Sequence, residues 1–496
     1  MQRRAAEKLA VADVETTPLE GGTRPRTLFW GLAVEGEDYR RFETTEVLFA
    51  FLARGSYRVY CHHDFDMIQA IMDGAALRIE IVAGGRVVEA KDNHGNRWLN
   101  SYKLFPTSLA KILASCGFAK PGLDQLEARN VADTVDALSA FRQLATAYQE
   151  VFGIDPLSGE YRTAASCAFA SLELAAGPVP LDNTRREYYR GGRVEAFRVG
   201  DCGEATCYDI NSSYPYSFAD APESDEQHLV DVTVKTRGPG PFNTLEQGKL
   251  VFPAGRFQTS VWRSNLDRYQ AGAAVVKLKS LDKRNVNLSW VQAAGRFMRY
   301  VYYLRRKADG ESNAALSYAI KICANSCYGR LGMHAVREGV RFSATQPDDR
   351  FSYSMPDGTF LTFPKHIAHA RVNYAFASFI TDNARARLYA ALVANPEVFY
   401  CDTDSLFIPA GTAFVGETGT GLGQWKQEKT GPLTVKGLKD YTFAGTEKLK
   451  GGKGGYVWTI RRALKQGTVL ESKRTRRSVY DKRLVLPSGA TLPVTV

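Results

Sequence analysis

The sequence predicts an α+β protein with two or three domains. Its 496 residues, 44% of them hydrophobic, are ample for more than one core. Short strand-like runs that end in acidic residues stand at 9–17, 205–215 and 398–408. Segments with helical spacing follow some of these runs, at 133–148 and 316–328. Strand runs and helical segments in one chain predict the mixed α+β class.

The net charge of +11 favours a polyanionic partner, although a basic enzyme that binds no nucleic acid would also fit it. The eight cysteines include no Cys-x-x-Cys pair, which argues against a zinc ribbon and against a disulfide framework. The sequence shows neither a signal peptide nor an apolar run long enough to cross a bilayer. We therefore expect a soluble, intracellular protein without a membrane partner.

The N-terminal third carries acidic residues in a suggestive order. Asp13 and Glu15 share one face of the first strand, Asp66 follows a second strand, and Asp133 opens an amphipathic helix. Asp136 is the rival to Asp133 on that helix. Carboxylates in this order form the constellation of a two-metal exonuclease. Each residue alone is more often structural, and Asp133 would also suit a helix start, where the dipole favours an acid.

Two loop segments contain residues that suit contact with DNA. Ser101 begins a run of hydroxyl, aromatic and basic residues that suits single-stranded DNA, although an ordinary loop is as good an interpretation. Tyr189, Gly191 and Gly192 lie in a basic, aromatic stretch whose glycines would allow close approach to a phosphate strand or would serve an interdomain turn. We place a domain boundary just before this stretch.

A hairpin is predicted around Asp402 and Asp404, because apolar strands flank Asp-Thr-Asp on both sides. Two carboxylates in one tight turn repel each other unless a cation is near, and oxygen-only ligands suit Mg²⁺. Asp209 also ends a strand. The two distant strands could join in one antiparallel sheet and share two metals. The alternative for the turn alone is a solvated acidic loop.

The helix at 316–328 presents Lys321, Asn325 and Tyr328 on one face, since they stand at i, i+4 and i+7. A cation, an amide and an aromatic ring make a poor core face and a good surface for a nucleotide. Gly329 stands where a C-cap glycine belongs. Upstream, Arg305 lies in a basic run that could face the same phosphates or could be a solvated helix end.

Four motifs in order resemble those of family B DNA polymerases. The segment 209–215 resembles the first palm motif, 321–329 the fingers motif, 400–405 the second palm motif and 439–441 the Lys-x-Tyr motif that holds the primer. The N-terminal acids resemble the proofreading exonuclease of the family, and 189–192 resembles its linker motif. The compact, protein-primed branch of viruses and mobile elements is the closest comparison.

The resemblance implies a ribonuclease H-like exonuclease domain at 1–185, followed by a right-hand polymerase domain at 186–496. Within the second domain it implies a palm at about 186–295 and 365–438, fingers at about 296–332, a β-hairpin insertion at about 333–364 and a thumb at about 439–496. In the protein-primed branch, an insertion at this position encircles the template.

The resemblance also implies a role for each matched residue. Asp209 and Asp404 would hold two Mg²⁺, with Asp402 assisting, and two more Mg²⁺ would lie in the exonuclease site, Mn²⁺ being a substitute. The exonuclease catalytic and metal residues would be Asp13, Glu15, Asp66 and Asp133; the nucleotide-binding residues would be Tyr214, Ser213, Arg305, Lys321, Asn325 and Tyr328; the DNA-binding residues would be Tyr189, Gly191, Gly192, Ser101, Lys439 and Tyr441.

Three positions depart from the family pattern. His62 stands where the exonuclease usually has Asn, Arg129 where it has Tyr, and Ser213 where the palm motif has Leu. The predicted function is a proofreading DNA polymerase of viral or mobile-element replication. Its partners would be template–primer DNA, deoxynucleoside triphosphates and, as one candidate for the priming end, a terminal protein. The alternatives are an exonuclease whose polymerase half only binds DNA, and a catalytically silent DNA-binding scaffold.

Overall fold

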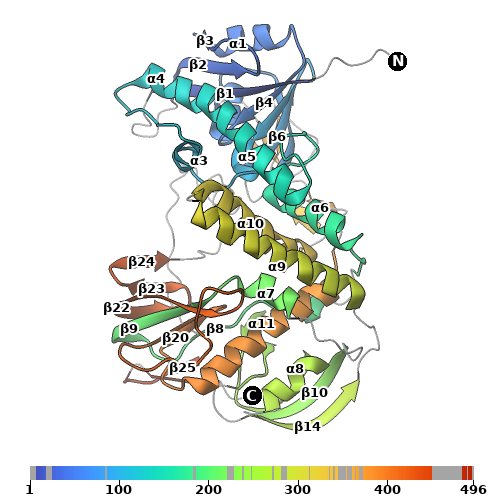
Figure 1. Ribbon diagram of the computed structural model, residues 1–496, viewed down its shortest axis with the longest axis vertical. Helices are drawn as coiled ribbons and strands as arrows, with labels where there is room; N and C mark the ends of the chain where they lie inside the picture. Colours follow the sequence, from blue (N-terminus) through green and yellow to red (C-terminus); the bar gives the residue numbers. More distant parts are fainter. Residues whose placement is uncertain are drawn as a thin grey trace.

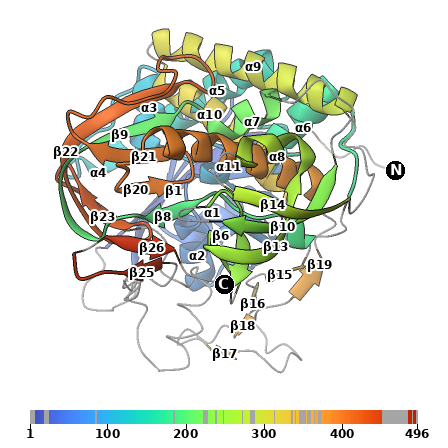
Figure 2. The ribbon, with the colours of Figure 1, turned by 90° about the horizontal axis from the view of Figure 1, so that it is seen from below.

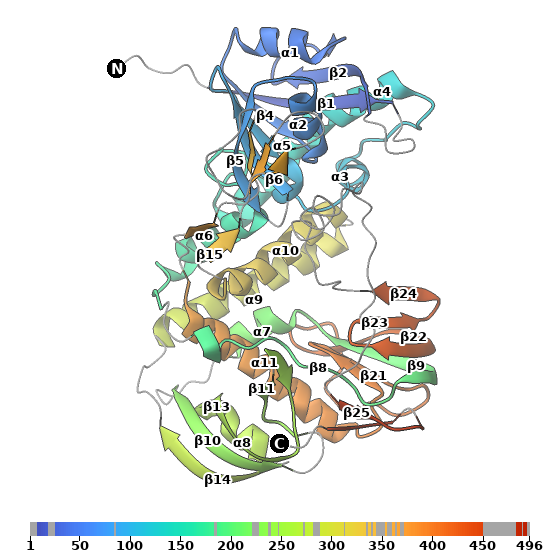
Figure 3. The same ribbon diagram turned by 180° about the vertical axis from the view of Figure 1, so that it is seen from behind.

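A computed structural model of the chain places an N-terminal sheet domain at one end and two further sheets at the other, with a pair of long helices between them (Figures 1 and 3). The structure describes residues 7–17, 25–83, 86–182, 186–220, 228–236, 240–246, 248–270, 273–280, 288–311, 313–333, 336–338, 341–343, 353–354, 360–362, 365–367, 372–449, 483–488 and 490–493. Within these ranges, no helix combines the length and the apolar composition needed to span a bilayer.

The N-terminal sheet has the strand order β3-β2-β1-β4-β7-β6-β5. Strand β1 pairs parallel with β4, and β4 with β7, while the other pairs are antiparallel. The apolar part of β1 is almost fully buried, as expected of a central strand. The strands are β1 Lys8–Thr16, β2 Thr27–Val34, β3 Arg40–Phe42, β4 Tyr57–Cys61, β5 Leu77–Ala83, β6 Arg86–Asp92 and β7 Arg97–Asn100.

Helices lie on both faces of this sheet, and one of them departs from the predicted helix start at Asp133. The helix begins at Leu126 and continues to Phe152, with a π-helical segment from Ala132 to Asp136. Asp133 therefore lies inside the helix, in a widened turn of the kind that often marks functional sites. The helical segments are α1 Thr45–Leu52, α2 Phe65–Met72, η1 Ser101–Lys103, α3 Leu109–Ser115, α4 Leu126–Val131, η2 Ala132–Asp136, α5 Ala137–Phe152, α6 Ala164–Ala176 and η3 Arg186–Tyr188.

A second sheet, antiparallel throughout, has the order β24-β23-β22-β9-β21-β20-β8. The predicted division at residue 186 falls between α6 and the first strand of this sheet. Strands β23 and β24 continue the sheet past residue 439, where the sequence predicted the start of the thumb, and 450–482 lie outside the described residues. The strands are β8 Val194–Ala196, β9 Gly200–Ile210, β20 Tyr400–Asp402, β21 Ser405–Pro409, β22 Trp425–Gly437, β23 Asp440–Phe443 and β24 Thr446–Leu449.

Helix α11 (Tyr374–Ala394) runs between this sheet and a smaller antiparallel sheet (Figure 2). Leu388 and Ala391 of α11 pack against the larger sheet, while Ala386 and Tyr389 pack against the smaller one. The smaller sheet and its neighbours comprise β10 Leu229–Thr236, β11 Thr244–Glu246, β12 Lys249–Val251, β13 Gly255–Trp262, α8 Arg263–Gln270 and β14 Ala273–Ser280.

The predicted fingers are a pair of helices, α9 (Leu288–Gly310) and α10 (Ala314–Leu331). Helix α9 begins before the predicted start at 296. Helix α10 runs past Gly329 and is capped by Gly332, so the prediction that Gly329 ends this helix is wrong. Buried residues of α10 and α9 share one core cluster with α5 and α6 of the N-terminal domain.

Short antiparallel strands occupy the predicted insertion. Strand β16 (Arg341–Ser343) and β17 (Tyr353–Ser354) both pair with β18 (Phe360–Thr362), while β15 (Val336–Glu338) pairs with β19 (Lys365–Ile367). The turn predicted at 356–358 lies outside the described residues. Near the C-terminus, β25 Arg483–Val485 pairs with β26 Thr491–Pro493.

Candidate active sites

The predicted hairpin is present, with Asp402 at the end of β20 and Asp404 in the turn before β21. Asp402 pairs with Ser405 across the hairpin, and the Asp404 N–H donates to the Asp402 carbonyl at 2.6 Å. Between them Thr403 adopts a φ of 62°, which is unusual for a β-branched residue. The Thr403 N–H donates to the carbonyl of Arg193 at 2.7 Å, and this bond ties the turn to the chain just before β8.

Asp209 reaches this turn from the neighbouring strand, so the predicted joining of the two distant strands is confirmed. Strand β9 pairs antiparallel with β21, and Asp209 lies opposite Ser405. The N–H of Ile210 donates to the carbonyl of Asp404 at 2.8 Å. Residues almost two hundred positions apart are thereby brought side by side at the ends of two inner strands of the sheet.

The electrostatic repulsion between Asp209 and its neighbouring carboxylates favours the binding of a cation at this end of the strands. Burial, followed by repulsion from Asp404, raises the pKa of Asp209 to about 8. Burial, followed by repulsion from Asp402, raises the pKa of Asp404 to about 6. Only oxygen ligands are offered here, and Mg²⁺ typically binds one or two carboxylates together with substrate phosphates. Within the described ranges, no group of three or more His, Cys, Asp or Glu side chains is arranged to hold a metal ion by itself.

The carboxylates lie in a cavity of about 760 Å³ that also has a basic and aromatic wall. Helix α10 contributes Lys321, Asn325 and Tyr328, the three residues predicted to share one face. Tyr214, from α7 (Ser213–Ala219), stacks on Tyr328 with ring centroids 3.9 Å apart and an interplanar angle of 22°. The volume falls in the range of small-molecule sites.

Arg305 and Ser213 also border the cavity, in different ways. The Arg305 guanidinium donates to the hydroxyl of Ser212 at 3.2 Å, which holds it beside the start of α7. Ser213 is only 2% exposed although it borders the cavity, and its contact with a nucleotide stays a prediction.

Lys439 and Tyr441 are joined directly to the acidic hairpin. The Lys439 ammonium pairs with the Asp402 carboxylate at 2.5 Å, and the Lys439 N–H donates to the hydroxyl of Tyr400 at 2.8 Å. The Tyr441 ring packs against those of Tyr400 and Phe407. Both predicted primer-binding residues line the cavity.

Sequence reasoning missed several charged residues of the cavity, among them Lys426 and Glu428. Lys426 lies opposite Asp209 on β22, and its ammonium pairs with Glu428 at 3.0 Å. In the sequence they belong to a charged run that resembles any solvated strand. Only the register between β22 and β9 reveals their place, and register cannot be read from this run.

The glycine-rich linker passes directly behind the acidic turn. A Cβ added to Gly192 would lie 2.6 Å from Thr403 Cγ2, whereas one added to Gly191 would meet nothing within 4 Å. Tyr189 packs against Gly332, because a Cβ there would lie 2.3 Å from the Tyr189 ring. The linker therefore contacts both the turn and the end of α10.

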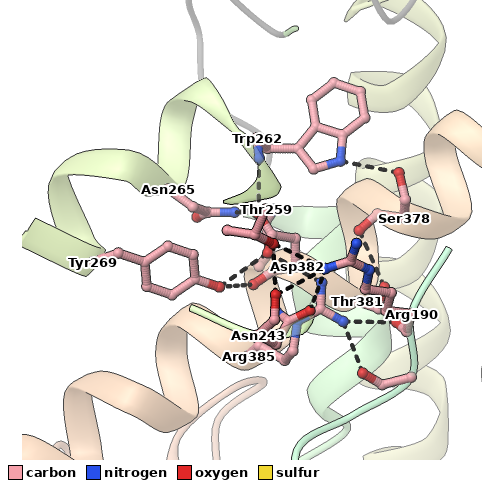
Figure 4. A network of polar contacts seen from close by, with 12 residues as sticks. Arg190, Asn243, Thr259, Trp262, Asn265, Tyr269, Ser378, Thr381, Asp382 and Arg385 are labelled. Atoms are coloured by element: carbon pink, nitrogen blue, oxygen red, sulfur yellow. Dashed lines mark hydrogen bonds and ion pairs between the residues drawn. The ribbon is translucent and has the colours of Figure 1, made fainter. Parts of the chain in front are cut away.

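A buried polar network holds the linker in this position (Figure 4). Arg385 of α11 donates to the carbonyls of Arg190 and Gly191, both at 2.7 Å. Its guanidinium also pairs with Asp382 at 3.1 Å. Asp382 in turn accepts hydrogen bonds from Trp262 N–H, Asn265 and Tyr269 at 3.0–3.1 Å.

The four N-terminal acids predicted from the sequence come together in a second site. Asp13 and Glu15 lie on β1, Asp66 on α2 and Asp133 in the π-helical segment. Burial, then repulsion from Asp66, Asp133 and Glu15, raises the pKa of Asp13 well above its ordinary value. Burial raises the pKa of Asp66 to about 7. This set, like the first, offers only oxygen ligands under mutual repulsion.

Asp133, rather than Asp136, belongs to this second site. Burial alone raises the pKa of Asp136, whereas Asp133 acts on Asp13, Glu15 and Asp66. The Lys120 ammonium, missed in the sequence, pairs with the Asp133 carboxylate at 2.6 Å. Arg129, in the place of the usual Tyr, lies 3.8 Å from the same carboxylate.

The predicted contact between Ser101 and DNA is corrected by the structure. Ser101 is 0% exposed, and its hydroxyl contacts the Nδ1 of His62 at 3.1 Å and the carbonyl of Cys61 at 3.2 Å. His62 is itself buried, and burial lowers its pKa to about 3. Its Nε2 contacts the carbonyl of Thr107 at 2.9 Å. The two residues tie the end of β4 to the segment before α3.

Comparisons with known proteins agree with this arrangement. No family model matches the chain. The DNA-directed DNA polymerase of Enterobacteria phage PRD1 is 24% identical over 500 residues, covering 90% of this chain and 85% of that protein. The phi29 DNA polymerase in a ternary complex with primer–template DNA and nucleotide matches with a TM-score of 0.67 and 15% identity, covering 99% of this chain and 100% of that one. An orthorhombic crystal form of the same polymerase matches with a TM-score of 0.65.

The fold is that of the phi29 DNA polymerase, and the four motifs that resemble those of family B DNA polymerases gather at one cavity. The chain is similar over most of its length to the PRD1 polymerase in sequence and to the phi29 polymerase in fold.

Proposed function

We propose that the chain extends a primer 3′-hydroxyl by template-directed addition of deoxynucleotides, and that its N-terminal site removes nucleotides in the 3′–5′ direction. The observation that carries the first activity is the meeting of Asp209 and Asp404 beneath Lys321 and Tyr328 in one cavity. Family B polymerases depend on divalent metals, and the oxygen-only carboxylate set fits two Mg²⁺, or Mn²⁺ in their place. Such cations would stabilise the charge that develops on the phosphoryl oxygens.

The chain's own residues would bind and orient the substrates. Lys321 and Arg305 would neutralise the triphosphate as the primer hydroxyl attacks the α-phosphate and pyrophosphate leaves. Tyr214, stacked on Tyr328, would lie under the sugar and exclude a 2′-hydroxyl, while Asn325 would position the nascent pair. Lys439 and Tyr441 would hold the primer end beside Asp402.

Replacement of one ligand tests the polymerase. The variant Asp404→Ala should lose primer extension by at least about 10³-fold while retaining duplex binding, because only the charge at the reacting phosphate is left uncompensated. Glu204→Ala is the matched control, since Glu204 is an exposed acid on the same strand as Asp209. Extension that survives in Asp404→Ala would refute the assignment.

In the N-terminal site, water would attack the terminal phosphodiester, and the last nucleotide would leave as a 5′-monophosphate. Asp13, Glu15, Asp66 and Asp133 would hold two divalent cations, and Lys120 would offset part of their charge. The double variant Asp13→Ala/Glu15→Ala should stop degradation of single-stranded DNA and leave extension intact. Degradation that persists in it would place the activity elsewhere in the chain.

A chain that only degrades or only binds DNA is the alternative, and the intact carboxylates Asp209, Asp402 and Asp404 argue against it. We further propose that a terminal protein supplies the priming end, on the likeness to the PRD1 and phi29 polymerases. Labelling with one deoxynucleotide, with either an annealed DNA primer or a candidate terminal protein on the template, tests this. Label that appears only on the DNA primer would contradict protein priming.

A further inference from the structure

Asn130 lies fully buried beside the N-terminal acidic site, on the last turn of α4. Its amide nitrogen donates to the Asp13 carboxylate at 3.0 Å and approaches the Asp13 carbonyl at 3.3 Å. A hydrogen bond from Asn130 also lowers the pKa of Glu15, against the larger rise caused by burial. One neutral side chain thus bonds to Asp13 and also acts on the carboxyl group of Glu15.

The hydroxyl of Tyr39 determines which end of the amide faces the acids. It donates to the Asn130 Oδ1 at 2.9 Å, and the Oδ1 atom can only accept. The nitrogen, which can only donate, must then point toward Asp13 and Glu15. Burial raises the pKa of Tyr39 to about 12, so this hydroxyl keeps its proton at neutral pH.

A glycine on the neighbouring strand makes room for the amide. Gly31 lies directly opposite Asp13 in the pairing of β1 with β2. A Cβ at Gly31 would lie 1.7 Å from the Asn130 Oδ1 and about 3.0 Å from the Tyr39 ring. Any side chain there would displace the amide, so Gly31, Tyr39 and Asn130 form one unit.

We propose that Asn130, oriented by Tyr39, is a positioning residue of the N-terminal site, and that its amide holds the Asp13 and Glu15 carboxylates in place for divalent cations. This inference rests on the proposed exonuclease function. A neutral donor suits the task, because it restrains two mutually repelling carboxylates without occupying the place of a cation. The charged ammonium of Lys120, in contrast, pairs directly with the Asp133 carboxylate.

The test measures Mn²⁺ affinity by electron paramagnetic resonance on the full chain, with Asp209→Asn and Asp404→Asn present throughout to remove metal binding at the proposed polymerase site. Adding Asn130→Ala should weaken Mn²⁺ binding at the N-terminal site by about 10–100-fold, the usual cost of losing an outer-shell partner. Tyr39→Phe should weaken it in the same direction by less. In the chain with its polymerase site intact, single-stranded DNA degradation should fall in the same order, and primer extension should stay unchanged.

Asn96→Ala is the matched control. Asn96 is a buried asparagine of the same domain whose hydrogen bonds go to Asp92, Tyr57 and Leu52 and to none of the four acids. It should lower the melting temperature without changing Mn²⁺ affinity. Unchanged Mn²⁺ affinity in Asn130→Ala, or an equal loss in Asn96→Ala, overturns the proposal.

Two further comparisons keep the outcomes separate. If Asn130→Ala does not fold, Tyr39→Phe decides alone, because it removes a single hydroxyl. If wild type and Asp13→Ala degrade DNA equally, the exonuclease function fails, while the Mn²⁺ series still decides whether Asn130 positions a cation site.

Discussion

At the scale of single residues, the chain holds carboxylates so close together that they repel one another unless a cation lies between them. Asp209 and Asp404 approach each other across the pairing of β9 with β21, and both are partly buried. Lysines reduce the repulsion but do not remove it, since Lys439 is committed to Asp402 and Lys426 to Glu428. The site is therefore built for a ligand that brings positive charge.

This repulsion predicts how stability depends on pH when divalent metal is removed. In the folded chain the pKa of Asp209 is about 8 and that of Asp404 about 6, whereas in the unfolded chain both ionise near pH 4. The folded state binds these protons more tightly, so the stability they contribute is lost as pH rises from about 4 to about 8. Thermal unfolding in EDTA should show a melting temperature that falls over this window.

The variant Asp209→Asn should flatten that fall, because it removes one of the two repelling charges. Glu204→Gln, an exposed change on the same strand, should leave the slope as it is. Adding Mg²⁺ should raise the melting temperature most at the alkaline end. A melting temperature that rises across the window in EDTA, with its slope unaltered by Asp209→Asn, would contradict the assigned repulsion.

At the scale of elements, the linker and the acidic turn are in direct contact, so a change in one should displace the other. Gly192 touches Thr403, and Thr403 is bonded to the carbonyl of Arg193. Gly192→Ala would force a Cβ to within 2.6 Å of Thr403 Cγ2, displacing the turn that carries both aspartates. Primer extension should fall by about tenfold or more, since small misplacements of reacting groups are costly.

Gly191→Ala is the control for this prediction, because a Cβ at Gly191 meets nothing within 4 Å. Adding Thr403→Ser to Gly192→Ala removes the clashing methyl group and should restore part of the extension rate. Equal rates for the two alanine variants would show that the close approach does not matter for synthesis.

Sequence reasoning succeeded where the chemistry is local to an element and also anticipated that the Asp209 strand joins the hairpin, but it failed where a residue's place depends on strand register. The Asp402–Asp404 hairpin and the face shared by Lys321 and Tyr328 follow from short-range spacing, and both are present. Lys426 was missed because its place beside Asp209 is set by strand register.

Two other expectations failed because tertiary contacts outweighed local signals. Ser101 looked available in a polar loop, yet tertiary packing buries it against His62. The helix start expected at Asp133 was wrong because α4 and the π-helical segment continue one helix through this position. The polar segment before Asp133 shows no helical spacing of apolar residues, so nothing in the sequence indicated that the helix begins earlier.

At the scale of the whole molecule, the two halves share one core. The cluster of buried residues that contains Phe141 of α5 also contains Cys323 of α10 and Phe379 of α11. The thiol of Cys327 contacts the carbonyl of Ala168 on α6 at 3.4 Å. The wall of the polymerase cavity is thus packed on the back of the N-terminal domain, and neither half has a separate core on this side.

This shared core predicts that damage at the junction impairs both activities together. Phe152, at the end of α5, is 4% exposed and packs on Phe297 of α9 with ring centroids 6.3 Å apart. Phe152→Ala should destabilise the chain by about 3–5 kcal/mol through the cavity it leaves. We would assay degradation and extension across a urea series. The urea concentration at which half of the activity is lost should fall by the same amount for both activities.

Leu48→Ala is the comparison, because Leu48 belongs to a separate cluster on the far face of the N-terminal sheet. This variant should lower the urea midpoint of degradation more than that of extension. A Phe152→Ala chain whose extension midpoint stays at the wild-type value would show that the two halves unfold independently.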